Sequence, residues 1–121
     1  MPRILVVDDN AVSRELMRFV LKPLGHEFLE AGSGAEALDK IAEARPDIVL
    51  LDLEMPAPDG YAVLRQVRQN PDWRDLRVVA VTAYAMQGDR DKALAAGFDG
   101  YVTKPVNAVE LREYVEELLR T

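Results

Sequence analysis

The feature that most constrains the fold is an unbroken run of bulky apolar residues, Ile48 to Leu51, that ends at Asp52. The chain then continues as Leu53-Glu54-Met55-Pro56. A continuous apolar run, in contrast to an alternating one, is typical of a strand that is buried on both faces of a sheet. Asp52 is then expected where a central strand leaves the sheet. An isolated aspartate before a loop is more often a turn residue, so its role depends on the rest of the chain.

Strand and helix patterns alternate along the whole sequence. Short apolar segments predict strands over residues 4–7, 26–31, 47–51, 78–82 and 99–103. The second of these is more polar than the others, which favours an edge position. Helical spacing is found in five sets of apolar residues: Val12, Leu16, Phe19 and Val20; Leu38, Ile41 and Ala42; Val63, Leu64 and Val67; a thin set within 86–96; and Leu111, Tyr114, Val115 and Leu118. Because the helix over 86–96 has a thin apolar face and contains Gly88, we expect it to be the least firmly docked.

Several polar residues fit the ends of these helices. Asn10 is a suitable N-cap for the first helix, and Ser33 with Glu36 forms a capping box before the second. Asn107, followed three residues later by Glu110, caps the last helix. The caps support the alternating pattern of strands and helices.

Five strand–helix pairs with short connections predict an α/β fold, a (βα)5 doubly wound parallel sheet with helices on both faces and right-handed crossovers. The length of 121 residues suits one domain spanning residues 1–121. Ligands of such sheets bind beyond the carboxyl ends of the strands, where the strand order reverses.

Composition excludes several classes of function. A net charge of −6 argues against direct binding to nucleic acid or to an anionic membrane surface. The absence of cysteine excludes disulfides and thiolate metal sites. The first apolar run is interrupted by Asp8 and Asp9, so it does not resemble a signal peptide, and no segment approaches the roughly 20 apolar residues of a membrane span. A cytoplasmic protein without membrane insertion is expected.

Four of the five predicted strands end in a polar group that can take part in chemistry. These groups are Asp8 and Asp9 after the first strand, Asp52 after the third, Thr82 after the fourth and Lys104 after the fifth. In the strand order 2-1-3-4-5 the third strand is central, so these side chains would meet around Asp52. In the order 3-2-1-4-5 Asp52 would lie at the sheet edge and the cluster would not form. The clustering therefore favours 2-1-3-4-5.

The charges of this cluster point to a divalent cation. Three adjacent carboxylates repel one another, and Lys104 supplies only one positive charge. Oxygen ligands without histidine or cysteine favour Mg²⁺, with Mn²⁺ as the other possibility. An aspartate beside such a cation, a lysine and a hydroxyl is suited to attack a phosphoryl group and form an acyl phosphate. A purely structural ion-pair network would be a poor use of three acidic groups and one lysine.

At these residues the chain resembles the response-regulator receiver domains of two-component signalling, which have the flavodoxin-like chemotaxis-regulator fold. The resemblance covers essentially all of the chain. It rests on Asp8-Asp9, on LLDLEMPAPDG around Asp52, on Val81-Thr82-Ala83 and on Tyr101-Val102-Thr103-Lys104-Pro105.

The resemblance implies a role for each site residue. Asp52 would accept a phosphoryl group from a histidine kinase or a histidine phosphotransfer protein. Asp9, Asp52 and the backbone carbonyl of Glu54 would bind Mg²⁺, with Asp8 acting through water. Thr82 and Lys104 would contact the phosphoryl oxygens, and a cis bond between Lys104 and Pro105 would aim the lysine.

The resemblance also implies how the signal leaves the domain. Thr82 would move toward the new phosphoryl group, and Tyr101 would turn inward after it. The fourth helix, fifth strand and fifth helix would then present a changed surface to a downstream protein, as a monomer or a phosphorylation-dependent dimer. The domain would catalyse only its own phosphorylation and dephosphorylation. Met1-Pro2-Arg3 as a natural start favours a single-domain regulator.

Two other classes of protein remain as alternatives. A haloacid-dehalogenase-type phosphatase also uses an aspartyl nucleophile with Mg²⁺, but it would need that nucleophile on the first strand and a second aspartate where Glu54 stands. A flavodoxin-like FMN carrier needs a hydroxyl- and glycine-rich phosphate loop after the first strand, where Asp8 and Asp9 would repel phosphate. His26 is expected far from the site, and Trp73 is expected to cover the opposite rim of the sheet.

Overall fold

The computed structural model describes residues 2–120, in which five parallel strands form one sheet in the order β2-β1-β3-β4-β5. The strands are β1 (Arg3–Val7), β2 (Glu27–Ala31), β3 (Ile48–Asp52), β4 (Arg77–Thr82) and β5 (Gly100–Thr103). The helices are α1 (Ala11–Leu21), α2 (Gly34–Ala44), α3 (Gly60–Gln69), α4 (Asp89–Ala96) and α5 (Ala108–Arg120), and short 3₁₀ turns follow α1 and α3. The predicted fold class, strand order and central position of β3 are confirmed.

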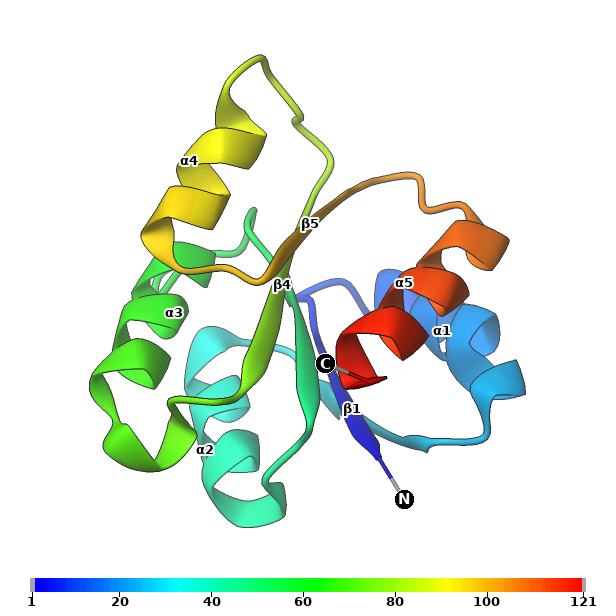
Figure 1. Cartoon of the computed structure of the whole chain (residues 1–121), viewed down its shortest axis with the longest axis horizontal. Helices are drawn as coiled ribbons and strands as arrows, with labels where there is room; N and C mark the ends of the chain where they lie inside the picture. Colours follow the sequence, from blue (N-terminus) through cyan, green and yellow to red (C-terminus); the bar gives the residue numbers. More distant parts are fainter. Residues whose placement is uncertain (1, 121) are drawn as a thin grey trace.

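The helices cover both faces of the sheet (Figure 1), with α1 and α5 on one side and α2, α3 and α4 on the other. Alternate residues of the central strands enter the two cores. Leu5, Val49 and Val78 face α2 and α3, whereas Ile4, Ile48 and Val79 face α1 and α5. Every residue of β3 is buried, as expected of a strand covered on both faces.

Helix α1 is present, but its buried face is not the one marked by the spacing of its apolar residues. Val12, Leu16 and Phe19 are exposed to 67%, 60% and 78%, and the residues that enter the core are Met17 and Leu21. The spacing of i, i+4 and i+7 still indicates a helix. The three side chains lie in one stripe of the helix, and in the structure this stripe faces solvent.

Helix α2 shows a smaller correction of the same kind. Its buried residues include Ala37 and Ile41, whereas Ala42 is exposed and Leu38 is half-buried. The expected caps are found, because Ser33 Oγ accepts from the Glu36 N–H at 3.1 Å and Asn107 Oδ1 accepts from the Glu110 N–H at 3.0 Å. The caps depend on local backbone geometry, which explains why the sequence predicts them well.

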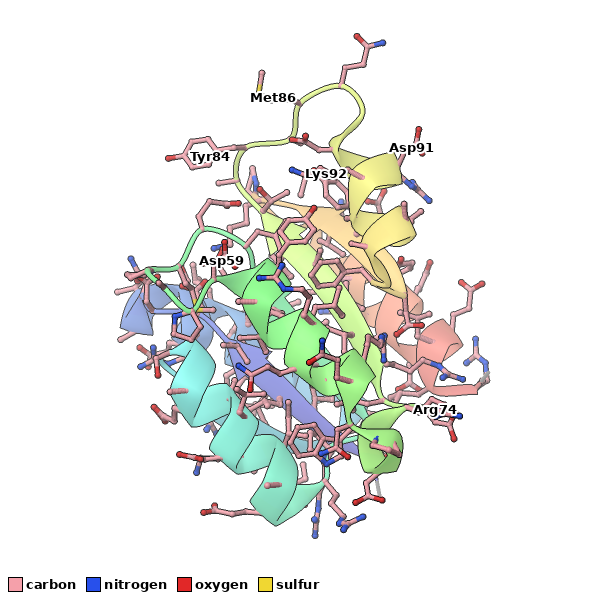
Figure 2. All side chains as sticks on the ribbon, turned by 90° about the vertical axis from the view of Figure 1, so that its left-hand side faces the viewer. Asp59, Arg74, Tyr84, Met86, Asp91 and Lys92 are labelled. Carbon is pink, nitrogen blue, oxygen red and sulfur yellow. The ribbon has the colours of Figure 1, made fainter. Side chains whose placement is uncertain are left out.

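Helix α4 is shorter than predicted, because residues 86–88 precede it. Gly88 has a left-handed backbone with φ of 88°, and the Met86 N–H donates to Asp89 Oδ2 at 2.9 Å across the helix start. Ala93 is the buried residue among the eight of α4. Figure 2 shows Tyr84 and Met86 projecting from the preceding loop, away from the body of the domain.

A hydrogen-bond network that the sequence does not reveal ties α3 to the β4–β5 half of the sheet. The Arg68 guanidinium donates to the Gly97 carbonyl at 3.1 and 2.9 Å, to the Leu76 carbonyl at 2.8 Å and to Asp99 Oδ2 at 2.8 Å. The same Asp99 oxygen accepts from the Val78 N–H at 2.8 Å. One side chain therefore joins the end of α3, the start of β4 and both ends of the α4–β5 connection. Within the described residues, none of the helices has the length and apolar character of a membrane span.

Candidate functional site

The predicted site residues lie together at the carboxyl edge of the sheet. Asp8 follows β1, while Asp52 and Thr82 end β3 and β4; their exposed fractions are only 3%, 4% and 2%. Asp9 is exposed at the mouth of the site. Asp8, Asp9 and Asp52 each offer one carboxylate oxygen, and these oxygens lie within 4.8 Å of one another. Strands that are far apart in sequence thus bring three acidic groups to one point.

Backbone groups hold both the side chain of Asp52 and the chain that follows it. Its Oδ1 accepts from the Glu54 N–H at 3.0 Å, and the Leu53 N–H donates to the Val81 carbonyl at 2.9 Å, which extends the β3–β4 pairing past the strand end. Burial raises the pKa of Asp52, as do the charges of Asp8 and Glu54, while the Glu54 N–H and Lys104 act in the opposite direction. The carboxylate is therefore held in place in an environment that disfavours its charge.

Lys104 reaches this cluster from β5. Its Nζ lies 2.9 Å from Asp8 Oδ2 and 3.7 Å from Asp52 Oδ2, and its backbone N–H donates to the Thr82 carbonyl at 2.8 Å. Burial alone would lower the pKa of Lys104, but the hydrogen bond with Asp8 and the nearby carboxylate charges outweigh it and raise the pKa. The peptide bond between Lys104 and Pro105 is cis, as the family resemblance implied.

Asp8 is supported by a residue that the sequence did not identify. The Arg14 Nη1 donates to the Asp8 backbone carbonyl at 2.6 Å, and its Nε donates to Glu30 Oε1 at 3.1 Å. The Asn10 N–H donates to Asp8 Oδ1 at 2.9 Å. Arg14 lies four residues into the first helical segment, so no local motif marks it. Arg14 comes within reach of Asp8 and Glu30 only when α1 packs beside β1 and β2.

The Glu54 side chain makes the closest polar contacts on the β4 side of the site. Thr82 Oγ1 donates to Glu54 Oε2 at 2.5 Å, and the Ala83 N–H donates to Glu54 Oε1 at 2.7 Å. The Thr82 oxygen in turn accepts from the Tyr84 N–H at 3.1 Å. The sequence placed Glu54 at the border of the site and gave its backbone carbonyl a role in binding the cation, but it did not predict these side-chain contacts. The side chain is hydrogen-bonded to the predicted phosphoryl-contacting residue.

Tyr101 already packs inward in this conformation. Its ring contacts the core under α2, α3 and α4, and its hydroxyl is buried without a hydrogen-bond partner among the described residues. Burial raises the pKa of this hydroxyl, with smaller contributions from Asp89, Tyr61 and Glu54. The Tyr101 N–H donates to the Tyr114 hydroxyl at 3.3 Å.

The two aromatic or imidazole side chains that were expected outside the site do lie outside it. His26 pairs with Glu116 of α5, and Trp73 packs at the other end of the sheet beside Pro46 and Leu76. Neither side chain is among the contacts of Asp52.

The donor set fits a hard divalent cation. Carboxylate oxygens converge from two neighbouring strands, and neither histidine nor cysteine is among them. Oxygen-only sites with few carboxylates suit Mg²⁺, which retains several waters. Lys104 offsets only one of the three carboxylate charges. The cluster therefore keeps a net negative charge, which such a cation would offset.

Comparison with known proteins places this geometry in a family. Residues 4–116 match the family described as the response regulator receiver domain. The chain is 32% identical over 120 residues to the polar-differentiation response regulator DivK of Brucella anthropi, with 98% of each chain covered. A putative response regulator from Chloroflexus aurantiacus is 33% identical, with full coverage of both chains and a TM-score of 0.93. The chemotaxis protein CheY4 of Vibrio cholerae is 27% identical, with 98% of each chain covered and a TM-score of 0.89.

These matches extend over the strands that carry the acidic cluster and the lysine, and they set aside the phosphatase and flavin-carrier alternatives. The chain therefore belongs to the response-regulator receiver domains, the signalling modules of two-component phosphorelays.

Proposed function

We propose that Asp52 is the phosphoacceptor of this receiver domain. The observation that carries the proposal is the convergence of a lysine and two other carboxylates on one buried aspartate: Lys104 Nζ lies 3.7 Å from Asp52 Oδ2, and the oxygens of Asp8, Asp9 and Asp52 lie within 4.8 Å of one another. Asp52 is also held by the Glu54 N–H, so its carboxylate is oriented before a donor arrives.

In the proposed reaction an Asp52 carboxylate oxygen attacks the phosphorus of a phosphohistidine on the donor protein. A new O–P bond forms while the P–N bond breaks, and its electron pair returns to the imidazole nitrogen. The product is an acyl phosphate on Asp52. Lys104 and Thr82 contact the phosphoryl oxygens and offset their charge with an ammonium group and a hydroxyl donor.

The residues that would hold Mg²⁺ are Asp9, Asp52 and the backbone carbonyl of Glu54, with Asp8 acting through water; Mn²⁺ fits the same oxygen donors. When bound, the cation would supply positive charge against both the carboxylates and the transferred group. The two carboxylate oxygens of Asp8 already accept hydrogen bonds, Oδ2 from Lys104 Nζ and Oδ1 from the Asn10 N–H. That pairing supports an indirect role for Asp8.

Thr82 and Tyr101 form the proposed switch, and Pro105 supports the position of Lys104. The Tyr101 hydroxyl is buried without a hydrogen-bond partner among the described residues, and the charges of Asp89 and Glu54 act on it. A movement of Thr82 and of the segment that leads to Asp89 would therefore change the surroundings of this hydroxyl. The α4, β5 and α5 surface is then the output face. A hollow of about 290 Å³ between β5 and α5, lined in part by Tyr101 and Tyr114, lies on that face.

The proposed partners are a histidine kinase or histidine phosphotransfer protein as donor and a downstream protein as target, without direct binding to nucleic acid or insertion into a membrane. Residues 1–121 act as one receiver domain in the cytoplasm, as a monomer or a phosphorylation-dependent dimer. Its only catalysis concerns its own phosphoryl group.

The exposed stripe of α1 supports a docking position for the donor. Val12, Leu16 and Phe19 share one helix face, and α1 begins immediately after Asp9 and Asn10. Single exposed apolar residues are ordinary, but three at helical spacing form a patch suited to packing against another helix. The stripe starts beside the mouth of the site, where a donor imidazole must enter.

The decisive experiment is intact-mass measurement after incubation with acetyl phosphate and Mg²⁺. We expect the mass of one phosphoryl group to be gained, because acetate leaves as the acyl phosphate on Asp52 forms. The gain should disappear with Asp52→Asn or with EDTA. A phosphoryl group retained on the Asp52→Asn variant would refute the assignment of the acceptor.

A further inference from the structure

We propose that the Glu54 carboxylate is an intramolecular competitor of the phosphoryl group, because it occupies the Thr82 hydroxyl and the Ala83 amide until Asp52 is phosphorylated. The proposal rests on the proposed role of Asp52 and adds a regulatory residue to that site. It gives a direction to the effect of Glu54, namely that this side chain favours the unphosphorylated state.

The contacts of Glu54 are selective. Both of its carboxylate oxygens are used, Oε2 at 2.5 Å from Thr82 Oγ1 and Oε1 at 2.7 Å from the Ala83 nitrogen. Thr82 is only 2% exposed, so its hydroxyl has little access to solvent and depends on this acceptor. The two donors are consecutive residues at the end of β4, which is the strand next to Asp52 in the sheet.

A hydroxyl and an amide each carry one proton to donate. Thr82 Oγ1 therefore cannot donate fully to Glu54 and to a phosphoryl oxygen at once, and the same holds for the Ala83 N–H. A carboxylate and a phosphoryl group are also the same kind of acceptor, anionic oxygens that form charge-assisted hydrogen bonds. Occupation of these donors by one group excludes the other.

Electrostatic repulsion acts in the same direction. Glu54 carries one negative charge and a phosphoryl group on Asp52 would bring about two more. The alternative role for the Glu54 side chain, direct binding of a cation, has less support. Its oxygens point to Thr82 and Ala83, and the carboxylates that cluster for a cation are those of Asp8, Asp9 and Asp52.

The test compares the wild-type chain with Glu54→Gln, which keeps the size of the side chain but has one oxygen and no charge. Glu43→Gln is the matched control, since Glu43 is exposed on α2 and its substitution changes the net charge equally. Two quantities are measured by NMR: the hydrogen-exchange rate of the Ala83 amide without ligand, and the Kd of beryllofluoride with Mg²⁺ as a phosphoryl mimic.

For Glu54→Gln we expect the Ala83 amide to exchange faster and beryllofluoride to bind more tightly, each by about tenfold, because a charged acceptor is replaced by a weaker neutral one. Glu43→Gln should match the wild type in both measurements. Glu54→Asp, whose shorter side chain cannot reach both donors, should behave like Glu54→Gln.

Equal or weaker beryllofluoride binding by Glu54→Gln, with normal binding by the wild type, would overturn the competitor role and leave Asp52 as the acceptor. Failure of the wild type to bind beryllofluoride or to accept a phosphoryl group would instead remove the proposed function, and the competitor role with it. Loss of folding in both Glu54 variants would assign the carboxylate a structural role and also contradict the proposal.

Discussion

The ammonium group of Lys104 is closer to Asp8 than to Asp52, at 2.9 Å from Asp8 Oδ2 and 3.7 Å from Asp52 Oδ2. The ammonium group of Lys104 is therefore hydrogen-bonded to Asp8, and the buried Asp52 carboxylate has only its more distant charge. The only hydrogen bond assigned to its side chain among the described residues comes from the Glu54 N–H. This relationship explains why burial raises the pKa of Asp52 even though a lysine is near.

The first prediction follows from that raised pKa. Folded Asp52 holds its proton more tightly than the unfolded chain does, so ionisation of Asp52 disfavours folding and stability falls as the pH rises through the folded pKa. Asp52→Asn cannot ionise, and in EDTA at pH 7 its Tm should exceed that of the wild type by a few degrees. The difference should vanish below about pH 3.9, the ordinary aspartate pKa. Thermal unfolding across this pH range tests the prediction, and a lower Tm for Asp52→Asn at pH 7 would contradict it.

The second prediction concerns two tyrosines whose hydroxyls have opposite roles. Among the residues that the structure describes, the buried Tyr101 hydroxyl has no hydrogen-bond partner, so Tyr101→Phe should raise the free energy of unfolding by about 1 kcal/mol. The Tyr114 hydroxyl accepts from the Tyr101 N–H at 3.3 Å on the edge strand, so Tyr114→Phe should lower it by about 1 kcal/mol. Urea unfolding of both variants measures the two changes, and two changes of equal sign would show that one assignment is wrong.

The third prediction concerns the network around Arg68. Its planar guanidinium reaches two carbonyls and one carboxylate, which a lysine cannot reproduce. Arg68→Lys should therefore cost about 2–3 kcal/mol in the free energy of unfolding. Arg65→Lys, exposed on the same helix, is the control and should change stability by less than about 0.5 kcal/mol. Similar urea midpoints for the two variants would argue against the network.

The fourth prediction tests close packing at the start of α2. A Cβ on Gly34 would lie 2.5 Å from the Pro58 carbonyl oxygen and 2.8 Å from a Val63 methyl group. Helix propensity alone would favour alanine by about 1 kcal/mol, but the clash should outweigh it, and Gly34→Ala should destabilise the domain by about 1–3 kcal/mol. Chemical unfolding measures whether the free energy of unfolding rises or falls. A stabilised variant would contradict the prediction and would mean that the loop around Pro58 moves aside at little cost.

The fifth prediction separates docking from chemistry at the donor surface. The donor in this test is a histidine kinase that phosphorylates the wild type. Leu16→Ser and Phe19→Ser should each slow phosphotransfer from this kinase by about tenfold or more, because apolar anchors dominate such interfaces. Phosphorylation by acetyl phosphate should change by less than about twofold, since a small donor makes no such contact. Equal slowing with both donors would place the effect in the site itself. Glu43→Ser, exposed on α2, is the surface control.

Much of the site could be predicted because its parts lie at strand ends. Apolar runs that stop at Val7, at Leu51 before Asp52, and at Val81 before Thr82 fix where three parallel strands emerge. Parallel pairing then brings those ends to one edge. The burial of Asp52 and the approach of Lys104 follow from strand order, which the clustering of charges had favoured.

Other features could not be predicted, because they depend on which face of an element meets the rest of the protein. Helical spacing correctly indicated a helix with Val12, Leu16 and Phe19 on one face, but it did not reveal which face is buried. Met17 and Leu21 pack against the sheet, and the regular stripe faces solvent. The contacts of the Arg14 and Arg68 side chains span segments that are far apart in sequence.

The sequence by itself determined the alternation of strands and helices, the caps and the chemical groups that end each strand, because these depend on nearest neighbours and on period. Tertiary structure alone decided that the Glu54 side chain accepts hydrogen bonds from Thr82 and Ala83. The direction of a side chain in a loop depends on which donors the neighbouring strand presents, and that strand is brought beside it only when the sheet is assembled.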